Sequence, residues 1–230
     1  YLATLLGSHS EATAAVLAIF LGGLAGGYSL FGATTARFTA RARARGEAPR
    51  LLRLYGAVEV GIGVWVMLFP LLFGLAQAVS FRFPAADHEL AAFAFDVFLT
   101  VLLIGPPTIL MGGTIPILTQ ALAHDLEDAT RVHAWIYAFN TMGAFAGALA
   151  AGFVLVPLLG LDGMLYTMGC INLAAGIVFV LLQRGAAGRA APAPIAATGA
   201  PVRAATAFAA YSGVAMLSGT GRVFSVRPSS

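Results

Sequence analysis

LYGAVEVGIGVWVMLFPLLFGLAQAV, residues 54–79, decides the fold, because a single charged side chain, Glu59, interrupts it. The run is longer than the roughly 20 apolar residues that a helix needs to cross the hydrocarbon layer of a membrane. It lacks the alternation of apolar and polar residues, and it exceeds the roughly 9–11 residues of a barrel strand. Residues 54–79 therefore predict a transmembrane helix.

The composition of the whole chain is that of an integral membrane protein. Hydrophobic residues make up 59% of the 230 residues and charged residues only 10%, with a mean hydropathy of +0.87. A soluble domain of this length carries many more charges on its surface, so a cytosolic globular enzyme is excluded. The 13 basic residues, all of them arginine, are not interleaved with aromatic residues on one face. Nucleic-acid binding is therefore not indicated.

Four further apolar stretches extend the pattern into a bundle. They lie between Glu11 and Arg37, from Leu90 to Leu122, from His133 to Asp162 and from Asp162 to Arg184. The expected fold is all-α, a polytopic transmembrane helical bundle with about five spans in residues 1–183. A tight turn at Leu159–Gly163 is expected between the last two spans. No initiator Met precedes Tyr1, so we also expect a first helix that is missing here.

The placement of arginine predicts the orientation of the bundle. The loop Arg37–Arg53 holds six arginines, and short loops rich in arginine stay on the cytoplasmic side of a membrane. Residues 82–89 are then expected on the outer side, and the expected location is a bacterial inner membrane. Residues 184–230 are rich in Ala, Pro and Gly, which predicts a linker with a short tail. Within that tail, residues 204–221 are a weak sixth span.

Two carboxylates, Glu59 and Asp96, lie inside the apolar runs. A charged group at membrane depth is costly, and it normally has a hydrogen-bond partner or faces a cavity. Two interpretations stay open for each: a structural carboxylate near the interface, or a group that binds a cation or an amine. The opposite depths of the two residues argue against one shared site.

Residues 105–120, GPPTILMGGTIPILTQ, are the most unusual segment of the chain. Two adjacent prolines remove two backbone donors and Gly112-Gly113 adds flexibility, so we expect a kink or a break, with a bend of more than about 20° near Pro106-Pro107. The freed carbonyls need partners such as the hydroxyls of Thr108 and Thr114, or water in a cavity. A broken helix is typical of transporter sites, and the alternative is a kink that only shapes packing.

Small residues recur at helical spacing in two of the runs. They are Gly22-xxx-Gly26 with Gly23-xxx-Gly27, and Gly143-xxx-Gly147. Such faces let helices approach closely, so we expect them to pack within the chain or against another protein. Asn140 is expected to form a hydrogen bond across helices.

The sequence contains no motif for catalysis or for a cofactor. Neither GxGxxG after a strand nor GxxxxGK[ST] occurs, so no cofactor is expected. Cys170 is the single cysteine, which excludes a disulfide within the chain. The residues that raise the question of a metal are His124, Asp125, Glu127, Asp128 and His133. Their spacing favours a solvated loop, so no metal site is expected.

Four of these runs together resemble the membrane portion of spermidine-synthase-like proteins, which are fused transporter-like/spermidine synthase proteins. The runs are residues 11–32, 54–70, 105–122 and 131–164. The resemblance covers about Tyr1–Leu182. Its most specific parts are PPT-x-x-MGGT-x-P at residues 106–116 and Y-x-x-NT-x-G-x-x-x-G at residues 137–147.

The resemblance implies a membrane bundle with a further helix before it. In long members of that family an aminopropyltransferase-like domain with a Gly-rich nucleotide-binding motif follows, and nothing here matches that motif, so no catalytic residue carries over. The expected function is a non-catalytic module, a structural or accessory subunit that contacts the bilayer and other membrane subunits. Two alternatives stay open: a transporter-like or polyamine-sensing domain, and the membrane part of a spermidine-synthase-like enzyme whose catalytic domain lies outside this chain.

Overall fold

Long helices form nearly all of the chain that the computed structural model describes, namely residues 2, 10–82, 89–123 and 126–186. No strand occurs within these ranges. The elements are α2 (Ser10–Ala44), α3 (Leu51–Ser80), α4 (Glu89–Leu122), α5 (Leu126–Ala150), the π-helical turn η1 (Ala151–Leu155) and α6 (Val156–Ala186). The expectation of an all-helical fold is therefore confirmed for the described residues.

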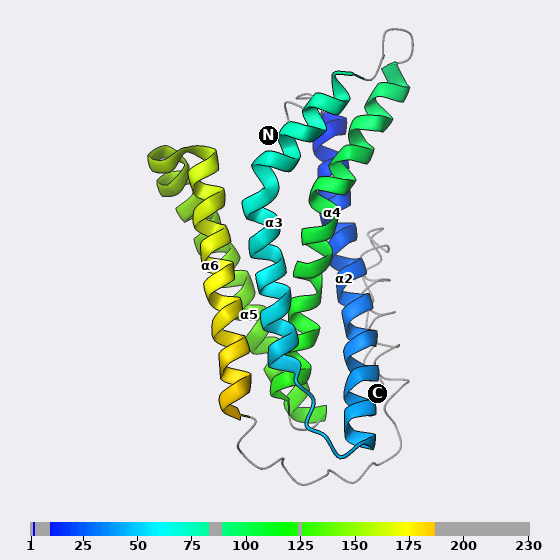
Figure 1. The fold of residues 1–230 in the computed structure, drawn as a ribbon, viewed down its shortest axis with the longest axis vertical. Coiled ribbons are helices and arrows are strands. Elements are labelled where there is room, and N and C mark those ends of the chain that lie inside the picture. The colour runs from blue at the N-terminus through cyan, green and yellow to red at the C-terminus, as the bar shows by residue number, and fades with distance from the viewer. Residues whose placement is uncertain (1, 3–9, 83–88, 124–125, 187–230) are drawn as a thin grey trace, which may run out of the picture. The chain divides into compact units, whose positions relative to one another are not determined.

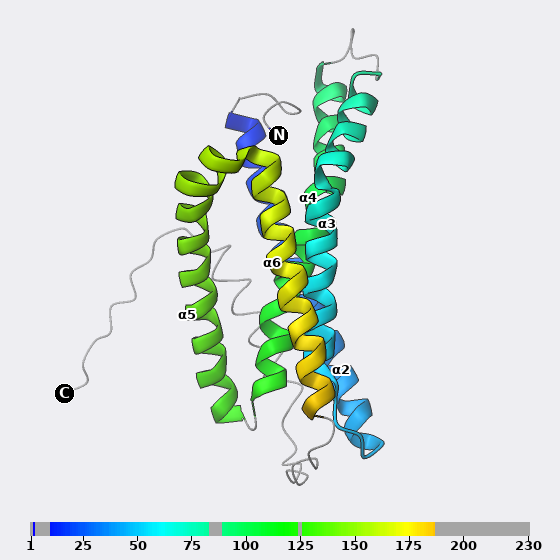
Figure 2. The same cartoon turned by 60° about the vertical axis from the view of Figure 1, so that its left-hand side comes forward.

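Four of the helical segments are long and apolar enough to cross a membrane. They are Ala12–Ala44, Leu51–Ser80, Leu90–Leu122 and Asp128–Gln183. The fourth segment does not run straight, because Gly160 (φ 72°, ψ −179°) interrupts its helical geometry. This conformation lies in the region that favours glycine. Figure 2 shows α5 and α6 joined at their upper ends and running in opposite directions, with the interruption inside the turn predicted at Leu159–Gly163.

Neighbouring helices pack in the order α2, α4, α3, α6, and α5 packs against α4. Figure 1 shows the first four side by side. The arginine-rich end of α2 and the start of α3 lie at one end of the bundle, and the Ser80 end of α3 lies with the Glu89 end of α4 at the other (Figure 1). Successive helices therefore run in alternating directions.

The contact between α3 and α4 holds two hydrophobic clusters. One is built on Phe73, Ala76, Leu99 and Leu103, and the other on Val58, Ile62 and Ile117. Ile117 has no exposed surface, and it is packed by Phe31 of α2 as well as by α3. This cluster joins α2, α4 and α3 into one packed unit.

The parallel pair α2 and α4 approaches closely through glycines on both helices. A Cβ added at Gly23 would overlap the side chain of Thr108, and one added at Gly27 would overlap the backbone of Ile109. On the α4 side of the same contact, a Cβ at Gly112 would overlap the backbone of Leu24 of α2. The segment predicted to break is thus a packing surface for α2, which agrees with its structural interpretation.

The antiparallel pair α3 and α6 meets through two matched pairs of glycines. A Cβ at Gly56 would lie 2.5 Å from the carbonyl oxygen of Gly176, and one at Gly63 would lie 2.9 Å from that of Gly169. The two glycines on each helix are seven residues apart, which is two helical turns, so they lie on one face. Here Tyr55 also packs edge-on against Phe179, with ring centroids 4.6 Å apart.

Three prolines, Pro106, Pro107 and Pro116, lie inside α4, and the helix is continuous along its whole length, so of the expected kink or break only the kink remains open. Pro107 lacks the N–H that would bond the carbonyl of Leu103 one turn earlier. The indole Nε1 of Trp65 on α3 donates to this carbonyl instead, at 2.9 Å. A neighbouring helix thus supplies the donor that proline removes. Figure 1 shows α4 curving along its length, and the size of the bend stays a prediction.

Several predicted features lie outside the described residues. They are the outer loop at residues 83–88, His124 and Asp125 of the polar loop, and the linker, tail and weak sixth span at residues 187–230. These expectations stay predictions.

Candidate functional site

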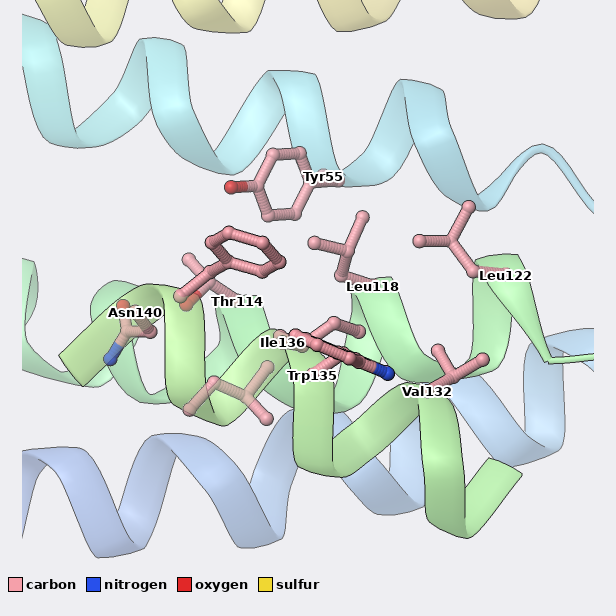
Figure 3. Close-up of a pocket in the computed structure, with 10 residues that line it drawn as sticks. Tyr55, Thr114, Leu118, Leu122, Val132, Trp135, Ile136 and Asn140 are labelled. Carbon is pink, nitrogen blue, oxygen red and sulfur yellow. The ribbon is translucent and has the colours of Figure 1, made fainter. Parts of the chain in front are cut away.

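The candidate site is a cavity of about 560 Å³ between α3, α4 and α5. Figure 3 shows α3 on one side and α4 and α5 on the other. Its walls are Tyr55 of α3, Thr114, Ile115, Leu118 and Leu122 of α4, and Val132, Trp135, Ile136, Phe139 and Asn140 of α5. Aliphatic and aromatic side chains dominate this lining, with few polar groups. A volume of this size is in the usual range for a binding site of a small molecule.

The polar groups of the cavity are concentrated toward one end. Figure 3 shows Asn140 and Thr114 there, with the hydroxyl of Tyr55 directed the same way, while Leu122 and Val132 close the other end. The Thr114 hydroxyl donates to the carbonyl of Met111 at 2.7 Å, so its proton is already used. Asn140 keeps an amide with both donors and an acceptor, and no hydrogen bond joins it to another described residue.

Glu59 lies one helical turn beyond Tyr55 on α3, and the Tyr55 hydroxyl and the Glu59 carboxylate interact along this helix. Glu59 itself is half-buried and is not part of the cavity wall. The polar partner of Glu59 thus lies on its own helix and not on a neighbouring one. The spacing of four residues between a tyrosine and a glutamate was the signal in the sequence that predicts this contact.

Asp96 accepts a hydrogen bond from the Ser80 hydroxyl at 2.6 Å, which joins the end of α3 to α4. Ser80 is 21 residues beyond Glu59, which is about 32 Å along the helix axis. The two carboxylates are thus far apart, and each has a hydroxyl partner. As the sequence indicated, they do not form one site.

Thr108, the third polar residue singled out in the sequence, is buried at 4% exposure. Its hydroxyl bonds the carbonyls of Ile104 and Gly105 at 2.8 and 2.9 Å, inside α4. It therefore packs against α2 and does not line the cavity. Of the five predicted polar residues, Thr114 and Asn140 come together in the cavity, and Glu59 reaches it only through Tyr55.

The beginning of α5 is anchored to the bundle by His133. Its Nδ1 lies 3.2 Å from the Thr119 hydroxyl of α4, and its ring meets Tyr28 of α2 edge-on at 6.4 Å between centroids. Nearby, Arg131 forms an ion pair with Asp128 at 2.9 Å. No group of three or more metal-ligating side chains occurs among the described residues.

Beyond this anchor, the described residues leave the side chains of α5 largely uncovered. Every residue from Tyr137 to Ala150 is exposed, which is nearly four helical turns on all sides. Asn140, Gly143 and Gly147 are spaced i, i+3 and i+7, so they lie on one face of this stretch. A Cβ at Gly143 or Gly147 would meet nothing within 4 Å, so this face makes no close contact with the described residues, and a contact with another protein stays a prediction.

The glycine stripe of α2 is divided in a similar way. Gly23 and Gly27 make the contact with α4, while added Cβ atoms at Gly22 and Gly26 would meet nothing within 4 Å. The packing role predicted for Gly22 and Gly26 is thus unfilled inside the described chain, and as a contact with another protein it stays a prediction.

A scan against protein-family models, a search of curated proteins and a search of solved structures each found no match to this chain.

Proposed function

We propose that this chain is a non-catalytic integral membrane module, an accessory subunit whose α5 binds a transmembrane helix of another protein. The observation that carries the proposal is the stretch Tyr137–Ala150, in which every residue is exposed. Asn140, Gly143 and Gly147 lie on one face of it. This face has the composition of a helix–helix contact in a membrane, where glycines allow close approach and amides bond across helices.

Lipid alone is a poor neighbour for this face. Hydrocarbon cannot satisfy the amide of Asn140. Each helical glycine also costs roughly 0.5–1 kcal/mol relative to alanine. On α3 and α6 that cost is offset by close packing at Gly56 and Gly176. A partner helix with small residues and a hydrogen-bond acceptor or donor would supply the same compensation on α5.

Membrane insertion with five spans is part of the proposal. Four long apolar segments support it, and the interruption at Gly160 divides the fourth into residues 128–159 and 161–183. At about 1.5 Å per residue, both parts exceed the roughly 30 Å of a hydrocarbon layer. The Arg37–Arg53 loop is then cytoplasmic.

Labelling of single cysteines tests this orientation. In a Cys170→Ser background, Arg45→Cys should stay unlabelled and Asp87→Cys should be labelled by an impermeant reagent outside intact cells. Labelling of position 45 but not of position 87 would refute the orientation.

Site-specific photo-crosslinking tests the accessory role. A photoreactive amino acid is placed at Phe145 of α5, which is 67% exposed, and the control position is Leu71 of α3, which is 62% exposed. We expect one identified membrane protein to be captured in membranes from Phe145 but not from Leu71. Gly143→Leu should abolish the adduct. Lipid adducts alone at both positions, or the same proteins at both, would contradict the proposal.

A second function, binding of an amphiphilic amine in the cavity, is favoured by the meeting of Tyr55, Thr114 and Asn140. Because Glu59 interacts with the Tyr55 hydroxyl, an amine in the cavity would contact Tyr55 together with Glu59 and would not meet an isolated carboxylate. The thermal stability of the purified protein with spermidine tests this function. A spermidine-dependent rise in the melting temperature that disappears in Glu59→Gln would establish the amine site, and no rise in the wild type would eliminate it.

The resemblance to spermidine-synthase-like proteins is a separate proposal. It predicts that the natural reading frame continues past Ser230 into a Gly-rich nucleotide-binding sequence, which sequencing of the complete gene decides.

A further inference from the structure

A second cavity, of about 540 Å³, lies at the arginine-rich end of the bundle, between the last third of α2 and the start of α3. Its lining falls into two chemical groups. The apolar group is Leu30, Phe31, Phe38 and Leu54, and the polar group is Thr34, Arg37, Arg41 and Arg50. The cavity therefore combines apolar walls with three positive charges.

Along α2 the lining begins with Leu30 and Phe31 and ends with Arg37 and Arg41, and Phe38 lies between these two arginines. Leu30, Thr34, Arg37 and Arg41 follow at i, i+4, i+7 and i+11, which places them in a row on one face. The apolar end of the row is about 16 Å from Arg41 along the axis. A ligand that fits this row has a long apolar part toward the middle of α2 and an anionic group at its arginine end.

No acidic side chain among the described residues neutralises the positive charge of the cavity. Arg37, Arg41 and Arg50 form no ion pair with any described residue. Arg50 directly precedes α3, whose N-terminus has no side-chain cap and no acidic residue in its first turn. The partial positive charge of that helix end adds to the field of the arginines.

The arginines of this loop do not all have the same role. Arg43, Arg45 and Arg53 are also exposed, yet none of them lines the cavity. Membrane orientation depends on the number of arginines in the loop and not on their direction. The convergence of Arg37, Arg41 and Arg50 on one apolar cavity is thus unexplained by orientation alone.

We infer that this cavity binds an anionic phospholipid, with the phosphate held by Arg37, Arg41 and Arg50 and an acyl chain lying along Leu30 and Phe38. Leu30 and Phe38 are 55% and 50% exposed, so they are open to a chain from the lipid layer. The Thr34 hydroxyl donates to the Leu30 carbonyl, which leaves the arginines as the donors for the phosphate. Basic pockets between helices at the cytoplasmic side of a membrane are well suited to anionic headgroups.

The apolar walls of this cavity favour a lipid over a free anion as its ligand. Inorganic phosphate would contact only the arginine end, and the rest of the cavity would stay empty. A phosphatidylglycerol molecule presents one phosphate and two apolar chains, which matches both groups of lining residues. Phosphatidylcholine has the same chains but a compensating positive charge beside its phosphate.

The binding test uses the purified chain in detergent with three added probes: phosphatidylglycerol, phosphatidylcholine and inorganic phosphate. Native mass spectrometry counts bound lipid and thermal unfolding follows stability. We expect phosphatidylglycerol to remain bound and to raise the melting temperature, and the other two to have little effect. Equal effects of the two lipids, or an effect of inorganic phosphate as large as that of phosphatidylglycerol, would overturn the inference.

Paired variants with the same change in charge locate the site. Arg37→Gln with Arg41→Gln should weaken phosphatidylglycerol binding about 30-fold, because two charges near the phosphate are lost. Arg43→Gln with Arg45→Gln removes two charges outside the cavity and should weaken it far less. Equal losses would show that total charge, and not the cavity, attracts the lipid.

Wild-type protein provides a measurement that does not depend on folding of the variants. A photoreactive phosphatidylglycerol with its reactive group in the acyl chain should modify residues 30–38 of α2. Modification spread evenly over all helices would contradict the inference.

Discussion

The contact between α3 and α6 and the exposed stretch of α5 both carry glycines repeated along one helix face, but only the first contact is closed. At the α3–α6 contact, Gly56 and Gly176 face each other so closely that a Cβ on either would meet the other's carbonyl at 2.5 or 2.6 Å. At Gly143 and Gly147 of α5 the space is open. The spacing of glycines alone therefore does not reveal where a helix packs.

The difference lies in what surrounds each face. The glycines of α3 and α6 are flanked by Val60, Leu173 and Val180, which fill the spaces beside them. Those of α5 are flanked by exposed side chains such as Phe139 and Phe145. A closed contact stabilises the isolated chain, whereas an open one contributes only when another molecule covers it.

A large side chain placed in the contact between α3 and α6 should change the free energy of unfolding more than any other substitution proposed here. Gly176→Leu would drive a side chain into the backbone of Gly56 and should lower the free energy of unfolding by about 3 kcal/mol. Gly143→Leu is the matched control, and its stability should be unchanged or higher by up to about 1 kcal/mol, because leucine is the better helix former. Reversible unfolding in detergent measures both. Equal losses at the two positions would break the comparison.

Removing the indole donor of Trp65, which bonds the Leu103 carbonyl of α4, should lower the free energy of unfolding by a smaller amount. Trp65→Phe leaves the Leu103 carbonyl without its indole partner, and we expect a loss of about 1–2 kcal/mol. Trp135→Phe is the control, because that indole is on α5 and its side chain is 61% exposed. If Trp135→Phe is as destabilising as Trp65→Phe, α5 is packed more tightly than this account allows.

The hydrogen bond between Ser80 and Asp96 should contribute least, about 0.6 kcal/mol, which is the average for such bonds between membrane helices. A double-mutant cycle with Ser80→Ala and Asp96→Asn isolates this energy. Asp96→Asn alone should be tolerated, because the amide keeps an acceptor for the hydroxyl. Strict additivity of the two changes would show that the bond contributes nothing.

The sequence predicts the helical fold well because long uncharged runs have few alternatives in a membrane. It also locates the turn at Gly160. It leaves open whether α4 kinks or breaks at Pro107, because the donor that replaces the missing N–H comes from a distant residue, Trp65. That donor is 38 positions from Leu103 in the chain, and only tertiary structure brings the two together.

The candidate site was only partly predictable. Thr114 and Asn140 stand out as polar residues in apolar runs, and both line the cavity. Tyr55 was missed, although its spacing from Glu59 favours a hydrogen bond within one helix. Phe139 and the other apolar walls could not be found from the sequence, because their role depends on where α5 lies relative to α3 and α4. The choice between Gly22 and Gly23 as the packing face likewise depends on the rotation of α2 against α4.

The most direct test of the central claim, that α5 binds a helix of another protein, is the structure of the particle extracted from its native membrane. The account predicts a transmembrane helix of another subunit against Gly143 and Gly147, with a polar group of that helix bonded to Asn140. A particle with the mass of this chain alone, in which only lipid covers Tyr137–Ala150, would contradict it.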